Sequence, residues 1–402
     1  MRECGGRVRH WTSLRRWVVL ALCATALAAC ATPPRIAFTQ SEQAQAVVPG
    51  IPDARVWADD PTLAQRTVAL AGGQSRPIIL ALSGGGADGA FGAGFLTGWT
   101  ARGNRPQFTI VTGASAGALI APFAFLGSGY DDSLRSVFTS GEMANFLQSE
   151  GLGGLLGSGL YKAGPLRELI AKHVDASTLE AIARQYRAGR RLYIVTTNLD
   201  AQRTAIWDMG RIAASGHPKA LDLFRSVMEA SATVPGVFSP VLIDVEAQGK
   251  QFAEMHVDGG VTANILVVPE AMLLANKPLL LGNVKPIVYI LVNGKLAPYF
   301  EVVKPRTLEI AVRAFETSVR ANTRNTLLAT YEFSKRRNWT INLAAIEESV
   351  PNQATPGFDT AYMRSLFDYG FERGRGGQMW QGTPAEPGEL RARRGPRVAG
   401  RQ

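Results

Sequence analysis

The sequence PIILALSGGGADGAFGAG runs from Pro77 to Gly94, and FTIVTGASAGAL follows it from Phe108 to Leu119. Each half begins with an apolar run that is typical of a buried parallel strand. Each then passes through glycines into a run of small residues that favours a helix. Two successive strand–turn–helix units, with further strand and helix patterns alternating after them, predict an α/β fold with a mostly parallel sheet.

The second half contains the pentapeptide GASAG, Gly113 to Gly117, which fits the pattern G-x-S-x-G. In this motif the serine occupies a tight turn between a strand and a helix, and the flanking glycines allow backbone and substrate to approach closely. The pattern is short, but its position after FTIV and before a helical run is the context that the motif requires. We therefore predict Ser115 as a catalytic nucleophile.

The glycines of the first half also fit G-x-G-x-x-G, the pattern of a dinucleotide-binding loop. Such a loop needs an acidic residue about twenty positions later for the ribose, and no Asp or Glu occurs between Gly89 and Tyr130. A Walker A loop is excluded because no Gly-Lys-Ser/Thr follows. The remaining functional interpretation is an oxyanion hole made by the backbone amides of Gly84, Gly85 and Gly86, and a purely structural turn is the alternative. We predict no cofactor and no metal.

A serine nucleophile needs a base, and histidines are scarce in this chain. His256 is the last of them, so a Ser–acid–His order would need an acid between Ser115 and His256. We expect His256 to be a structural or rim histidine. A carboxylate base is simpler, and Asp258 in Val257-Asp258-Gly259-Gly260 is the best candidate, with an ordinary Asp-Gly turn as the alternative.

The N-terminus has the pattern of an export signal. Four arginines between Arg7 and Arg16 precede an apolar run that is too short to span a membrane. The run ends in Leu27-Ala28-Ala29-Cys30, which is similar to a bacterial lipobox, in which the cysteine is acylated and becomes the first mature residue. The alternative is an ordinary signal peptide in which Cys30 has no role. Ala31 in place of Asp is, by resemblance to sorted lipoproteins, a sign of the outer membrane.

The order of the motifs resembles the patatin-like phospholipases: Gly-Gly-Gly-x-x-Gly, then G-x-S-x-G, then Asp-Gly-Gly. The stretch from Ala230 to Pro240 is similar to the one that precedes the Asp-Gly-Gly of that family. The resemblance covers about Pro77 to Pro269. It implies a three-layer α/β/α fold and a Ser115–Asp258 dyad without histidine that hydrolyses lipid acyl esters. One residue departs from the family, because Asp88 stands where Arg or Lys is usual.

The sequence therefore predicts four segments: a lipoprotein signal peptide at 1–29, a lipidated tether and N-terminal extension at 30–72, a patatin-like catalytic domain at 73–374, and a basic, disordered tail at 375–402. The expected activity is that of a serine esterase acting on membrane phospholipids or related lipids, in an outer-membrane lipoprotein on its periplasmic or surface face. No nucleic-acid partner is expected. The alternative function is a weakly active or non-catalytic lipoprotein that binds lipid or scaffolds an envelope complex.

Overall fold

A computed structural model describes residues 35–62, 76–147, 164–273, 285–353, 357–377 and 380–381. The predicted signal peptide and Cys30 lie outside these residues, as does nearly all of the predicted tail. In the described part of the chain, no helix is both long and apolar enough to cross a bilayer.

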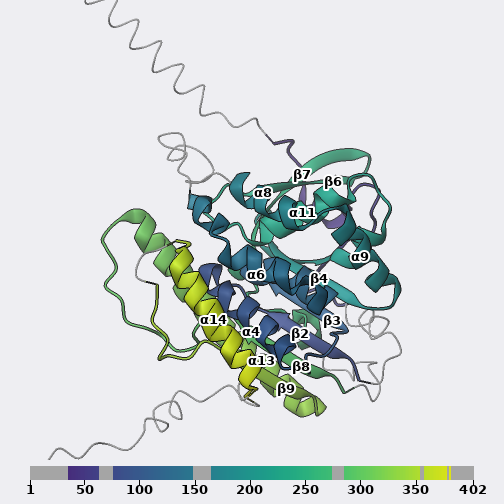
Figure 1. Ribbon diagram of the computed structural model, residues 1–402. Helices are drawn as coiled ribbons and strands as arrows, with labels where there is room; N and C mark the ends of the chain where they lie inside the picture. Colours follow the sequence, from purple (N-terminus) through teal and green to yellow (C-terminus); the bar gives the residue numbers. More distant parts are fainter. Residues whose placement is uncertain are drawn as a thin grey trace, which may run out of the picture.

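A nine-stranded sheet forms the middle layer, in the order β1-β5-β4-β3-β2-β8-β9, with β6 and β7 as a hairpin that joins it through β4 (Figure 1). The five strands from β4 to β9 along this path are mutually parallel, whereas β1, β5 and the hairpin are antiparallel to their neighbours. The strands are β1 (Arg55–Trp57), β2 (Ile78–Leu82), β3 (Ile110–Ala114), β4 (Arg191–Asn198), β5 (Arg203–Asp208), β6 (Val241–Ala247), β7 (Lys250–Asp258), β8 (Ile287–Val292) and β9 (Thr340–Ala345).

Helices cover both faces of this sheet, and β2 shows how its sequence serves both layers. Leu80 and Leu82 point into the larger core, while Ile79 and Ala81 point into the smaller one. On the larger side lie α4 (Gly89–Ala101), α5 (Ala116–Leu126), α6 (Asp131–Thr139), α8 (Gly164–His173), α9 (Ala176–Arg187), α10 (Met209–Ala214), α11 (Ala220–Ser231) and α14 (Thr360–Gly376). On the other lie α12 (Glu270–Leu273) and α13 (Thr307–Arg337). This is the expected three-layer α/β arrangement.

Most predicted strands and helices occur where the apolar pattern put them. The sequence predicts strands in the apolar runs at 78–82 and 287–292, which are β2 and β8 in full, and an edge strand at 338–343, which occurs as β9 at the end of the sheet. It also predicts a helix at 118–125 that Pro122 should kink or shorten; the helix is not shortened, because α5 begins earlier and has the proline in its interior.

Residues 35–62 are packed onto the domain, which corrects the expectation of a free tether over this stretch. β1 pairs with β5, and Val47 forms an isolated bridge to Glu246. Arg35 forms an ion pair with Asp200. The short helix α2 (Gln40–Gln45) starts at a capping box formed by Thr39 and Glu42. The expectation relied on a sustained hydrophobic period, whereas this segment is held by single buried residues such as Val48 and Ile51 together with strand pairing and ion pairs.

Candidate active site

Ser115 lies on a sharp turn between β3 and α5. Its backbone has φ 53° and ψ −125°, a conformation that costs a non-glycine residue about 1–3 kcal/mol. The turn is fixed by a relay through Ser231, whose hydroxyl accepts from the Ser115 amide at 3.0 Å and donates to the Val195 carbonyl at 2.6 Å. The Ser115 residue is 8% exposed. The predicted strand–turn–helix context of the serine is thus confirmed.

Close backbone packing explains why both motif glycines are needed. A Cβ at Gly113 would lie 2.4 Å from the Gly117 carbonyl oxygen. A Cβ at Gly117 would lie 2.4 Å from the carbonyl oxygen of Leu82, at the end of β2. The first turn of α5 therefore rests directly on the neighbouring strand, which holds the serine against the loop that follows β2.

Asp258 is the last residue of β7, and the antiparallel register sets it opposite Thr196 of β4. Its amide donates to the Thr233 carbonyl at 2.9 Å, and its side chain accepts from the Gly260 amide at 2.6 Å. A Cβ at Gly259 would lie 2.6 Å from the Val195 carbonyl oxygen, so the Asp-Gly-Gly turn also follows a close backbone approach.

The side chains of Ser115 and Asp258 are neighbours, and the interaction of the Ser115 hydroxyl with the Asp258 carboxylate favours the ionised form of the acid. Asp258 is 2% exposed. Burial raises the pKa of Asp258 to about 6, while the hydrogen bonds from Ser115 and the Gly260 amide act in the opposite direction. The arrangement sets a hydroxyl beside a buried carboxylate that takes up protons more readily than an ordinary aspartate.

The glycine-rich loop passes next to Ser115, since a Cβ at Gly84 would be 3.4 Å from the serine Oγ. The Gly84 amide, however, donates to both oxygens of Asn264, at 3.2 Å to the backbone carbonyl and 3.1 Å to the side chain. Gly84 is buried and is therefore corrected from a predicted oxyanion donor to a structural residue. Gly85 and Gly86 are exposed and precede a helix, where backbone amides lack intrahelical partners.

Two asparagines that sequence reasoning missed hold this loop in place. Asn264 accepts from Gly84 and donates to Thr323 of α13 at 2.8 Å. Asn293 follows β8 and bonds twice to Ser83: its amide donates to the Ser83 hydroxyl at 2.8 Å, and its side chain donates to the Ser83 carbonyl at 2.7 Å. A polar residue directly after a parallel strand was the available signal for Asn293.

Asp88, the residue that departs from the family pattern, is the N-cap residue of α4 and is half-buried. It accepts a hydrogen bond from the Tyr362 hydroxyl of α14 at 2.6 Å. Burial raises the pKa of Asp88 to about 6, Glu316 adds to this, and Lys295 and Arg320 oppose it together with Tyr362. A titratable carboxyl thus follows the exposed amides of Gly85 and Gly86 by two residues.

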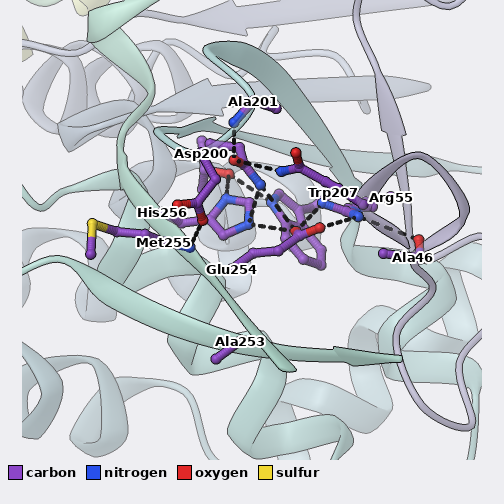
Figure 2. Close-up of polar contacts among 12 residues, drawn as sticks. Ala46, Arg55, Asp200, Ala201, Trp207, Ala253, Glu254, Met255 and His256 are labelled. Carbon is purple, nitrogen blue, oxygen red and sulfur yellow. Dashed lines mark hydrogen bonds and ion pairs between the residues drawn. The ribbon is translucent and has the colours of Figure 1, made fainter. Parts of the chain in front are cut away.

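His256 belongs to a buried polar cluster on β4 and β7 (Figure 2). Its Nδ1 is 2.9 Å from the Thr196 hydroxyl, and its Nε2 is 3.2 Å from the Glu254 carboxylate. Burial lowers the pKa of His256, and Glu254 opposes this. Both ring nitrogens have partners, which agrees with the structural role expected for this residue.

The other histidines of the described chain lie elsewhere: His217 lies against Gly50, and His173 stacks edge-on against Phe123 at 6.5 Å. Within that part of the chain, no three His, Cys, Asp or Glu residues gather as a metal site would require.

Residues 80–271 match the family model described as patatin-like phospholipase. No curated protein matches the sequence. Among solved structures, the chain is similar to the crystal structure of VipD from Legionella pneumophila, with 14% identity and a TM-score of 0.37. That alignment covers 75% of this chain and 66% of the VipD chain, which is just under two thirds of its length.

Proposed function

Residues 80–271 form a patatin-like phospholipase domain, and from this premise we propose that the protein is a lipid acyl hydrolase with a Ser115–Asp258 dyad. The observation that carries the proposal is that the strained turn sets the Ser115 hydroxyl beside the buried carboxylate of Asp258. The substrates proposed are phospholipids or related lipid esters.

In the proposed reaction, Ser115 Oγ attacks the ester carbonyl carbon while its proton passes to Asp258. The amides of Gly85 and Gly86 then donate to the developing oxyanion. Loss of one such donor typically lowers the rate on the order of 100- to 1,000-fold. As the tetrahedral intermediate collapses, the ester C–O bond breaks and Asp258 returns the proton to the leaving alcohol. Water attacks the acyl-enzyme with Asp258 again as base, which releases the fatty acid and restores the serine.

The raised pKa of Asp258 supports its proposed role as a base. A proton acceptor works best when its pKa lies near the working pH, because it is then both ionised and basic. At about 6, the pKa of Asp258 meets both needs near neutrality.

A fluorophosphonate probe together with an ester panel tests the proposal. We expect the wild type to be labelled and to hydrolyse short-chain esters and phospholipids, whereas Ser115→Ala should lose both properties. Asp258→Asn should lower turnover by on the order of 1,000-fold or more, because the variant loses both the proton acceptor and the group that orients Ser115. A folded wild-type protein that is neither labelled nor active on any ester would contradict the proposal.

One observation favours a second candidate, a weakly active or non-catalytic protein that binds lipid or scaffolds an envelope complex. Asp88 introduces a carboxylate two residues after Gly86, where negative charge opposes an oxyanion. If this candidate is right, Asp88→Arg should increase probe labelling by 10-fold or more while Ser115→Ala still abolishes it.

We also propose that acylation of Cys30 anchors the protein to the outer membrane. The basic n-region, the short apolar run and the Leu27-Ala28-Ala29-Cys30 sequence support this. Mass spectrometry of the mature protein should show a diacyl or triacyl modification that Cys30→Ser lacks, and equal masses apart from the substitution would contradict it.

A further inference from the structure

The segment between β8 and α13 carries the two most exposed large apolar side chains in the described chain. Phe300 is 91% exposed and Val302 is 78% exposed, and Ile310 on the first turns of α13 is 53% exposed. Exposed apolar residues are common singly, but three within eleven positions, with aromatic and basic neighbours, are typical of a binding surface.

This segment is held in place rather than merely left in solvent. Tyr299 is packed between two arginines of α13, with the guanidinium of Arg313 4.4 Å and that of Arg320 4.6 Å from its ring centre. Arg313 also donates to the Tyr299 carbonyl at 3.1 Å and pairs with Glu301 at 3.3 Å. Tyr299 and Glu301 are therefore turned toward the helix, while Phe300 and Val302 project outward.

The charges beside the apolar tip complement an anionic surface. Lys304 and Arg306 are exposed, and the Arg306 side chain is 75% accessible while it approaches Glu309 only at 3.7 Å. The segment also holds two acids, and both are paired with arginines: Glu301 with Arg313 at 3.3 Å and Glu309 with Arg306 at 3.7 Å. Apolar side chains that enter the acyl boundary, with cations at the level of the phosphates, are the pattern of an interfacial membrane site.

The tip is also joined to the candidate active site by a rigid element. Val319 of α13 lies 3.6 Å from where a Cβ at Gly260 would be, and Asn322 donates to the Thr262 carbonyl at 3.0 Å. Ile310 precedes Val319 by nine residues, or about 13–14 Å along a helix. The helical end of the tip is thus about half the thickness of a bilayer's hydrocarbon core from the residue of α13 that lies against the Asp-Gly-Gly turn.

We propose that the docking tip, residues 299–310, binds the surface of a bilayer that contains anionic phospholipid and so brings the dyad to its substrate. Phe300 and Val302 enter the acyl boundary, and Lys304 and Arg306 contact lipid phosphates. The proposal rests on the proposed lipid hydrolase function for its purpose, but vesicle binding can be measured without any turnover.

The test is co-sedimentation of the full chain with vesicles of phosphatidylcholine, with and without one quarter phosphatidylglycerol. All proteins carry Cys30→Ser so that no acyl chain contributes. Phe300→Ser/Val302→Ser should weaken partition by about 10-fold or more on both vesicles. Lys304→Gln/Arg306→Gln should weaken it only on the anionic vesicles, and salt should have the same effect.

Leu328→Ser is the matched control, because Leu328 is 54% exposed on the same helix but eighteen residues beyond Ile310. Equal binding of the Phe300→Ser/Val302→Ser variant and the wild type, or an equal loss with Leu328→Ser, overturns the proposal. It is also overturned if the double variant binds vesicles normally but loses self-association in light scattering, because the occupant is then a second copy. Thermal unfolding of each variant verifies folding.

Hydrolysis of a water-soluble short-chain ester separates this proposal from the previous one. Phe300→Ser/Val302→Ser should retain full activity on that ester and lose it on vesicles. A wild type that binds vesicles through the tip but hydrolyses no ester refutes the enzyme and keeps the docking tip. If the Phe300→Ser/Val302→Ser variant hydrolyses both substrates at the wild-type rates, the enzyme proposal stands and the docking tip is refuted.

Discussion

Asp258 must carry a charge in order to act as a base, yet it is almost completely buried. Burial raises the pKa of Asp258 to about 6, so the active carboxylate form is lost as the pH falls through that value. We predict that kcat/KM on a soluble ester reaches a plateau above pH 7 and falls about 10-fold per unit below pH 5. Because Asp88 has a pKa of about 6 as well, the same profile is measured in Asp88→Asn. Disappearance of the acid limb in that variant would assign it to Asp88.

The same burial makes Asp258 costly to the fold. The pKa of Asp258 is raised from 3.8 to about 6 because of burial, so the folded state holds this proton more tightly than the unfolded state does. The free energy of unfolding of the protein therefore falls as the pH rises. The cost develops above pH 4 and is complete above about pH 6. Asp258→Asn should therefore raise the free energy of unfolding by on the order of 2–3 kcal/mol at pH 8. Urea titration should find little difference near pH 4, and a gain that does not depend on pH would contradict this explanation.

Sequence motifs pointed to Ser115 and Asp258, which the structure sets beside each other, but not to all of the residues around them. Ser115 follows the apolar strand β3, Asp258 ends β7, and both adjoin glycines that close backbone contacts require. Gly84 was assigned wrongly because its partner, Asn264, is 180 residues away and no local pattern reports that hydrogen bond. The relay through Ser231 was missed for the same reason.

Helices α4 and α14 pack through glycines on both sides (Figure 1). A Cβ at Gly94 would lie 2.0 Å from the Phe367 carbonyl oxygen, and one at Gly370 would lie 2.3 Å from that of Phe91. Gly94→Ala should therefore push the two helices apart and lower the free energy of unfolding by about 1–3 kcal/mol, in spite of the better helix propensity of alanine.

Gly376→Ala provides the matched control for this prediction. Gly376 ends α14, and a Cβ there has open space around it. This variant should be neutral or up to about 1 kcal/mol more stable in urea unfolding. If Gly94→Ala is equally neutral, the glycines do not determine the spacing of the helices.

The sequence predicted the parallel strands well because buried apolar runs bounded by glycines are local signals. It did not predict α14 or β1. The 360–376 stretch mixes aromatic, charged and glycine residues, and its buried face is recognised only once α14 is seen packed against α4. β1 has three residues, and its pairing with β5 joins positions about 150 residues apart.

Across the whole molecule, the N-terminal segment is fastened by a buried ion pair. Arg55 of β1 forms two hydrogen bonds to the carboxylate of Glu254 on β7, one of them at 2.8 Å, and the side chains are 6% and 0% exposed (Figure 2). Arg55→Met removes the cation that pairs with this buried carboxylate, leaving it with Asn198 and His256, and should lower the free energy of unfolding by about 3–5 kcal/mol. Arg55→Met/Glu254→Gln should recover much of this loss.

Arg203→Met is the control for this pair. Arg203 binds Asp59 and also stacks on Trp57, but both side chains of that ion pair are more than a third exposed. Its loss should cost less than about 1 kcal/mol. Equal destabilisation by the Arg55 and Arg203 variants would show that burial of the charge is not the cause.

The ion pair between Arg35 and Asp200 limits how far the folded domain can lie from Cys30. If Cys30 carries the lipid, only four residues lie between it and Arg35, so that the bilayer is at most about 18 Å from a point fixed on the folded domain. A connection this short keeps the domain next to the membrane surface. If the protein hydrolyses lipids as proposed, it would then search for substrate in two dimensions, among the lipids directly beneath it, and would remain on the same membrane from one turnover to the next.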